Sequence, residues 1–159
     1  MRQGMGYSVI RGVLLLCVLS WPALVLAQGS SDRAREFEQK LEVSAPEQAF
    51  VDVTVNFKIN SDVIQSSSRV ELDSLAMALN SPALQAYRFQ VEGHTDMSGG
   101  YEANLDLSRR RAMAVSKYLA SRGVSTSRLV SVGKAYQDLL PNLPMNDPQN
   151  RRVVVRRVD

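Results

Sequence analysis

The side chains best suited to chemistry in this sequence are few. His94 is the only histidine and Cys17 the only cysteine, while Asp96 stands two residues after His94. A Ser-His-Asp hydrolase would have to use His94, but no nucleophile motif accompanies it, and a zinc site needs further His or Cys ligands. We therefore expect no enzymatic activity, no metal and no other cofactor. The expected role of His94 is that of a hydrogen-bonded structural residue.

Charged side chains are unevenly distributed along the sequence. Residues 28–108 hold 6 Lys or Arg against 13 Asp or Glu, a net charge of −7, whereas residues 109–159 hold 11 against 3, a net charge of +8. The two halves can attract each other in the fold or flank a zwitterionic ligand. The arginine runs at 109–111 and 151–152 also raise the question of nucleic-acid binding, although such runs are usually solvated faces.

The first 27 residues have the pattern of a secretory signal peptide. Arg2 and Arg11 precede an apolar run that ends at Ala27, with small residues where a signal peptidase reads them. This run of about 15 residues is shorter than the ~20 that a membrane-spanning helix needs, so we expect cleavage before Gln28 rather than a retained anchor. Cys17 follows three leucines, so lipidation there is not expected. Export argues against a nucleic-acid partner.

The remaining sequence alternates between strand-like and helix-like patterns. Residues 28–48 are polar and charge-mixed, as in a linker or a short helix. Hydrophobic periodicity then predicts strand 51–57, helix 68–81, strand 87–92, helix 108–122, strand 129–132 and, after a proline-rich loop, strand 153–155. Ser68 and Glu71 fit a capping box. The order β-α-β-α-β-loop-β predicts an α+β fold, a two-layer sandwich with a mixed four-stranded sheet and two main helices on one face.

An ordered set of short motifs gives the sequence a family resemblance. The motifs are Gly93-His94-Thr95-Asp96, Gly99, Asn104, Leu107-Ser108, Arg111-Ala112, Arg128-Leu129, Gly133, Pro141 and Asn150-Arg151-Arg152-Val153. In this order they resemble the OmpA-like peptidoglycan-binding domain of bacterial envelope proteins, found in outer-membrane protein A, the peptidoglycan-associated lipoprotein and MotB. The match runs from about Val51 to Val155, and we assign residues 49–159 to this domain.

The resemblance implies noncovalent binding of peptidoglycan through the diaminopimelate of its stem peptide, a group with an ammonium and a carboxylate. In the family an aspartate and an arginine bind these groups, and they correspond to Asp96 and Arg111. A carboxylate suits the ammonium, and a guanidinium binds a carboxylate bidentately. We expect Arg111 near the start of its helix, where free backbone N–H groups also attract anions. The alternatives are a turn residue for Asp96 and a solvated arginine run for Arg111.

The resemblance also implies further residues around this pair. The positions that match the family's cleft are Thr95, Asn104, Phe57, Asn60 and Ser61. Arg151 and Arg152 match an Asn-Arg-Arg turn, and because adjacent strand residues face opposite sides we expect one of them, preferably Arg152, to close the pocket. Ala135 stands where the family commonly has a glycine, a departure that would change the shape of the loop 134–147.

These observations predict a periplasmic, wall-associated protein that attaches an envelope component to the cell wall. Any association with the outer membrane would run through a partner, and residues 28–48 are the expected contact with an envelope complex. The alternatives are a scaffold subunit of a secretion or motility complex with weak or no wall binding and, less favoured, a wall-modifying enzyme.

Overall fold

A four-stranded sheet forms the centre of the computed structural model, which describes residues 21–42, 49–58 and 60–159. The elements are α1 (Trp21–Leu41), β1 (Phe50–Val53), α2 (Arg69–Leu79), β2 (Phe89–His94), α3 (Tyr101–Ser121), β3 (Leu129–Ala135) and β4 (Val153–Arg157). The strand order is β1-β4-β2-β3. β4 runs antiparallel to both β1 and β2, whereas β2 and β3 are parallel.

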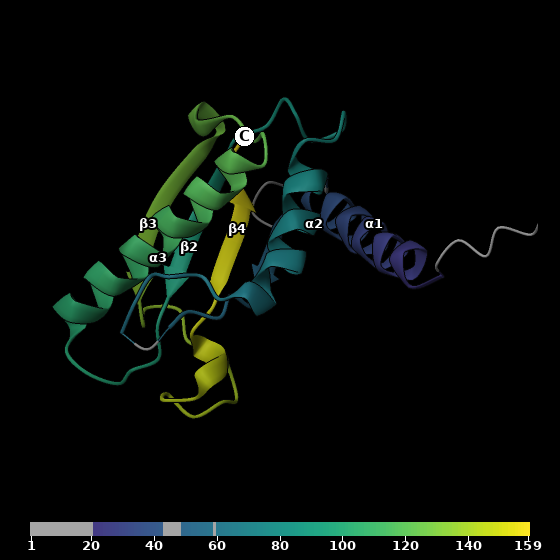
Figure 1. Ribbon diagram of the computed structural model, residues 1–159. Helices are drawn as coiled ribbons and strands as arrows, with labels where there is room; N and C mark the ends of the chain where they lie inside the picture. The colour runs from purple at the N-terminus through teal and green to yellow at the C-terminus, as the bar shows by residue number, and fades with distance from the viewer. Residues whose placement is uncertain (1–20, 43–48, 59) are drawn as a thin grey trace, which may run out of the picture.

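Helices α2 and α3 lie against the same face of this sheet, α3 over β2 and β3 (Figure 1). The core between the layers contains the alternate residues Phe89 and Val91 of β2, which pack with Leu75 of α2 and with Val115 and Leu119 of α3. Burying each large apolar side chain contributes about 1.5–3 kcal/mol. The predicted α+β sandwich with a mixed sheet is therefore confirmed.

Two predictions about how the helices begin differ from the structure. Helix α3 begins at Tyr101, seven residues before the predicted start at Ser108. The prediction missed these two turns because their apolar residues alternate along the sequence and do not recur at helical spacing. The expected capping box is also absent. The side chain of Ser68 makes no cap hydrogen bond and instead accepts one from the backbone N–H of Asn56, 2.7 Å away.

The segment before β1 contains a helix whose later turns belong to the core. Ala34, Phe37 and Leu41 of α1 are buried, and the helix packs beside α2. The guanidinium of Arg157 donates to the carbonyl oxygen of Leu41 at 3.1 Å, which joins the end of α1 to the last strand. No helix among the described residues is long and apolar enough to cross a membrane.

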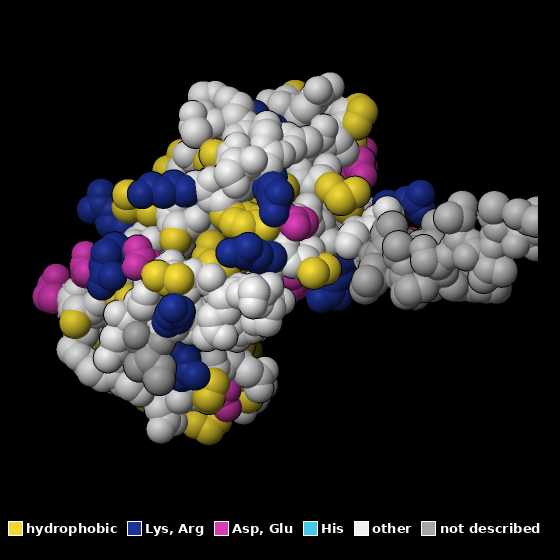
Figure 2. Space-filling view, in the orientation of Figure 1, with side chains coloured by type: hydrophobic (Ala, Val, Ile, Leu, Met, Phe, Trp, Pro, Cys, Tyr) yellow, Lys and Arg dark blue, Asp and Glu magenta, His cyan; other side chains and the backbone are white. Residues whose placement is uncertain are grey.

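Ion pairs connect the acidic and basic halves of the chain. Arg122 pairs with Asp73 at 2.8 Å, and Arg151 pairs with Asp96 at 2.6 Å. Lys and Arg side chains are interspersed with Asp and Glu on the face that carries α3 (Figure 2). The charge asymmetry of the sequence therefore contributes to attraction between the two halves within the fold, one of the two roles expected for it.

The contact of α3 with β2 and β3 depends on two glycines. A Cβ on Gly93 would overlap the carbonyl oxygen of Ser108, and one on Gly133 would lie 2.7 Å from the carbonyl oxygen of Leu105 and 2.8 Å from the backbone nitrogen of Arg109. The hydroxyl of Ser108 fills the remaining space, donating to Leu105 and accepting from the N–H of Ala135. The helix backbone can approach the sheet this closely only where the strands have no side chain.

Replacing Gly133 with alanine should therefore destabilise the fold. The new methyl group meets backbone atoms that cannot rotate away, so we expect a loss of about 1–3 kcal/mol in the free energy of unfolding. Denaturant unfolding of the purified protein measures this loss. Gly100→Ser is the control, because a Cβ at Gly100 meets no atom within 4 Å and its φ of −76° suits any residue. An unchanged midpoint for Gly133→Ala would contradict the proposed close contact.

Candidate functional site

A cleft of about 370 Å³ lies where four segments meet beside α3. The segments are the loop after β1, the loop after β2, the first half of α3 and the turn before β4. The lining residues are Phe57, Lys58, Asn60, Thr95, Asp96, Ser98, Asn104, Leu107, Arg111 and Arg151. Of the eight binding residues predicted from the sequence, this cleft brings together Asn60, Thr95, Asp96, Asn104, Arg111 and Arg151.

Asp96 lies at the carboxyl end of β2 and is 6% exposed. One carboxylate oxygen accepts the backbone N–H of Ser98 at 2.9 Å, and the other accepts the guanidinium of Arg151 at 2.6 Å. Burial by itself raises the pKa of Asp96, but the hydrogen bonds from Arg151 and Ser98 outweigh it, so the pKa lies below its usual value. Asp96 is thus an ionised carboxylate at neutral pH, held in a fixed orientation.

Arg111 lies in the middle of α3 and is 8% exposed. This corrects the expectation that it lies near the helix start, so free N–H groups of the first turn are not beside it. Its Nε donates to the carbonyl oxygen of Ser61 at 3.2 Å, and its guanidinium lies over the ring of Phe57, 4.8 Å from the centroid. Burial and the nearby Arg151 lower the pKa of Arg111, although arginine stays protonated in proteins.

The two arginines of the turn before β4 have different partners, and Arg151, not the expected Arg152, lines the cleft. Arg151 contacts Asp96 and lines the cleft, whereas Arg152 donates to Asp52 at 3.0 Å and to the carbonyl oxygen of Asp138 at 3.1 Å. The residue placed to close the pocket is therefore Arg151 and not Arg152, which the sequence analysis preferred. Strand alternation predicts that the side chains of adjacent residues point to opposite faces, but it does not predict which of the two faces the cleft.

The smaller residues of the cleft mainly shape it. Asn104 donates to the carbonyl oxygen of Ser98 at 2.9 Å and so holds the loop that carries Asp96. The hydroxyl of Thr95 is buried without a hydrogen-bond partner among the described residues, although its backbone N–H donates to Ala135. Ser61 is absent from the lining but positions Arg111 through its carbonyl group.

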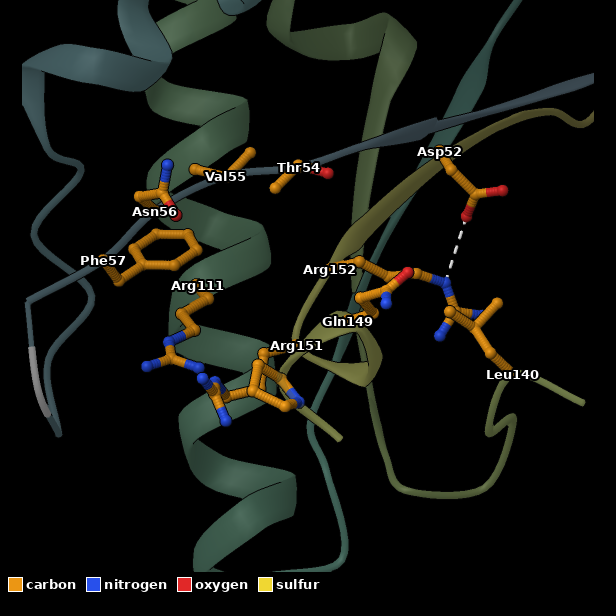
Figure 3. A pocket seen from close by; sticks show the side chains of 11 residues that line it. Asp52, Thr54, Val55, Asn56, Phe57, Arg111, Leu140, Gln149, Arg151 and Arg152 are labelled. Atoms are coloured by element: carbon orange, nitrogen blue, oxygen red, sulfur yellow. Dashed lines mark hydrogen bonds and ion pairs between the residues drawn. The ribbon is translucent and has the colours of Figure 1, made fainter. Parts of the chain in front are cut away.

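A second hollow of about 470 Å³ adjoins the cleft and shares Phe57, Arg111 and Arg151 with it (Figure 3). Its other side chains come from β1 and the chain that continues it, from the loop after β3 and from the turn before β4. They are Asp52, Thr54, Val55, Asn56, Leu140, Pro148, Gln149 and Arg152. Apart from Arg152, sequence reasoning missed these residues. Thr54 and Asn56 recur at strand spacing on the polar side of the first strand, which was the signal available for finding them.

Sequence reasoning was partly wrong about His94. The residue is 2% exposed, as a structural residue would be, but neither ring nitrogen has a hydrogen-bond partner among the described residues. Its Nε2 lies 3.7 Å from the carboxylate of Glu92, too far for a good hydrogen bond. The described residues contain no group of three His, Cys, Asp or Glu side chains placed to bind a metal ion.

Ala135 has a φ of 47°, the left-handed conformation that glycine adopts most readily. It is fully buried; its N–H donates to the hydroxyl oxygen of Ser108, and its carbonyl oxygen accepts the N–H of Thr95. These bonds explain how the chain maintains this conformation without a glycine. The strand end beside Asp96 is thereby fixed from two sides.

Comparisons with known proteins agree with this architecture. The OmpA family model matches residues 56–152, a range that contains every residue lining the cleft. The peptidoglycan-associated lipoprotein of Brucella melitensis is 35% identical over 111 residues, which cover 65% of this chain and 65% of that protein. The corresponding lipoprotein of Pseudomonas aeruginosa is 35% identical over 106 residues, covering 65% and 61%. The chain thus spans slightly less than two thirds of these relatives.

Two solved structures have the same fold. The peptidoglycan-associated lipoprotein of Burkholderia pseudomallei superposes with a TM-score of 0.56 at 26% identity, covering 65% of this chain and 88% of that one. The OmpA-like domain of FopA1 from Francisella tularensis superposes with a TM-score of 0.59 at 21% identity, covering 67% and 70%. The second likeness concerns the fold alone.

The pairing of Asp96 with Arg151 makes the pKa of this carboxyl group a test of the cleft geometry. We expect carbon-detected NMR titration to give a pKa below the unfolded value of about 3.9, and Arg151→Ala to raise it by removing a hydrogen bond and a positive charge. The ionised carboxylate stabilises the fold above the unfolded pKa, and this contribution is lost as the pH falls through the folded pKa. Arg152→Ala is the control and should leave the Asp96 pKa unchanged; a similar rise in both variants would contradict the specific pair.

Proposed function

Because this chain belongs to the OmpA family, we propose that its cleft binds peptidoglycan noncovalently through the diaminopimelate of the stem peptide. The observation that carries this proposal is the charge balance of the cleft. Asp96 is already paired with Arg151, whereas Arg111 has no carboxylate partner among the described residues. The cleft therefore contains one acid and a surplus of guanidinium groups, which suits a ligand with an ammonium beside a carboxylate.

In the proposed complex Arg111 binds the ligand carboxylate through its two terminal nitrogens, because its Nε is occupied by the carbonyl oxygen of Ser61. Phe57 holds the guanidinium plane against its ring, so the orientation is fixed before the ligand arrives. Asp96 binds the ammonium with the acceptor sites that Ser98 and Arg151 leave open, since a carboxylate has about four. Arg151 has a 45% exposed side chain and can turn towards the carboxylate.

We further propose that the protein is periplasmic and attaches an envelope component to the wall, without catalysing a reaction on it. The names of the relatives support the wall association. Processing after Ala27 remains part of this proposal. It would remove about two turns of α1 and leave the turns with Ala34 and Phe37, which pack on the domain.

Co-sedimentation with isolated sacculi tests the binding mode. The protein should pellet with diaminopimelate-type peptidoglycan and much less with lysine-type, because lysine lacks the carboxylate that Arg111 would bind. Asp96→Asn and Arg111→Lys should each weaken binding about 10- to 150-fold, the equivalent of a charge-assisted contact of ~1.5–3 kcal/mol. Arg111→Lys keeps the positive charge and much of the packing, but an ammonium cannot bind a carboxylate through two parallel hydrogen bonds as a guanidinium does.

Matched controls for this assay lie on the same helix. Asp106 and Arg110 of α3 form an exposed pair at 2.8 Å, and neither lines the cleft. Asp106→Asn and Arg110→Ala should pellet like the wild type. Thermal melts of all the variants separate loss of binding from loss of folding. Equal binding to both wall types, or folded cleft variants that still pellet fully, would refute the proposed mode of recognition. A folded wild-type protein that pellets with neither wall type would favour a scaffold with weak or no wall binding.

Fractionation tests the proposed location. If the chain is processed after Ala27 and carries no lipid, the protein should enter the soluble periplasmic fraction once the wall is digested. Immunoblotting of the fractions measures its release, and mass spectrometry of the released protein gives its first residue. Persistent membrane association after digestion would instead indicate a retained anchor or a membrane partner.

A further inference from the structure

The hollow beside the cleft has a chemistry of its own. Thr54, Asn56 and Gln149 line it, and their exposed side chains make no hydrogen bond within the described residues. Hydroxyl and amide groups of this kind both donate and accept hydrogen bonds. The hollow therefore offers several neutral polar contacts to a molecule that also carries both donors and acceptors.

The far end of the hollow is electrostatically balanced. Arg152 has a 12% exposed side chain, is paired with Asp52 and also donates to the carbonyl oxygen of Asp138. Its charge is thus compensated within the protein, and the dashed line in Figure 3 marks the ion pair. The surplus positive charge lies instead at the boundary with the cleft, where Arg111 and Arg151 line both spaces.

The three regions consequently follow one another in a fixed order. Asp96 at one end suits an ammonium, the Arg111 and Arg151 boundary suits a carboxylate, and the hollow suits uncharged amides. A diaminopimelate residue within a stem peptide matches this arrangement. Its free ammonium and carboxylate lie together at one end, and its other end continues into peptide bonds. The volume of about 470 Å³ is typical of a ligand site.

We infer that the hollow binds the peptide backbone that leads away from the diaminopimelate, an inference that rests on the proposed function. Gln149 and Thr54 line the hollow from two segments, the turn before β4 and the chain after β1, so both are available to hydrogen-bond this backbone. The protein then recognises a stem peptide as an extended segment rather than one side chain. Free diaminopimelate fills only the cleft and leaves the amide contacts unused.

Calorimetric titration of the purified protein with two probes tests this inference. The probes are free meso-diaminopimelate and the tripeptide L-alanyl-γ-D-glutamyl-meso-diaminopimelate. The tripeptide should bind more tightly. Gln149→Ala and Thr54→Val should each weaken tripeptide binding about 3- to 10-fold, as loss of a neutral hydrogen bond does, and should change the affinity for free diaminopimelate less than twofold. Gln85→Ala, an exposed amide outside both spaces, is the control.

Each other outcome has a distinct meaning. If neither Gln149→Ala nor Thr54→Val changes the affinity for the tripeptide, the inference is overturned and the proposed function stays intact. Equal weakening of both probes also overturns it, because the two residues would then act on the cleft. If only a muropeptide that carries the sugar responds to the variants, the hollow binds glycan and not peptide. If the wild type binds neither probe, the proposed function itself fails.

Discussion

The close approach of α3 to β2 and β3 is the constraint on which the site depends. Gly93 and Gly133 leave no side chain between helix and strands, and Ser108 joins the helix to the end of β3. Because α3 carries Asn104 and Arg111 while β2 leads into Asp96, this contact sets the separation of the groups that line the cleft. A displaced helix would move the guanidinium relative to the carboxylate, and charge-assisted hydrogen bonds tolerate little displacement.

The basic side chains of this protein differ in whether they have an acidic partner within the fold. Most basic side chains of the second half of the chain meet an acidic partner from the first half, as Arg122 and Arg152 do. Arg111 is buried against Phe57 and bonded only to a carbonyl group among the described residues. Unlike Arg128 and Arg157, which bond to carbonyl groups elsewhere in the fold, it lines the cleft. Keeping an unpaired guanidinium partly desolvated costs free energy, and the strongest compensation available to it is an anionic ligand. This is the physical link between the fold and the proposed binding of a zwitterion.

Sequence patterns predicted the elements with strong periodicity and missed those without it. The alternation in β1 and β2 and the apolar spacing in α2 located these elements to within a few residues. The apolar residues in the first two turns of α3 alternate and do not recur at helical spacing, so periodicity did not reveal this part of the helix, and Arg111 was consequently placed near a helix start. Ser68 lost its predicted capping role because the chain after β1 offers its hydroxyl a backbone N–H from Asn56.

The sequence by itself determined the fold class and the family motifs, because these depend on residue type and spacing. Its resemblance to the family also supplied the proposal that Asp96 and Arg111 are the central acid and base. Only the tertiary structure decided the pairing of Asp96 with Arg151, the separate role of Arg152 and the hollow formed by Thr54 and Gln149. These groups are distant in the chain and meet through the strand order and the turn before β4. Their contacts are set by backbone direction in three dimensions, which local periodicity does not encode.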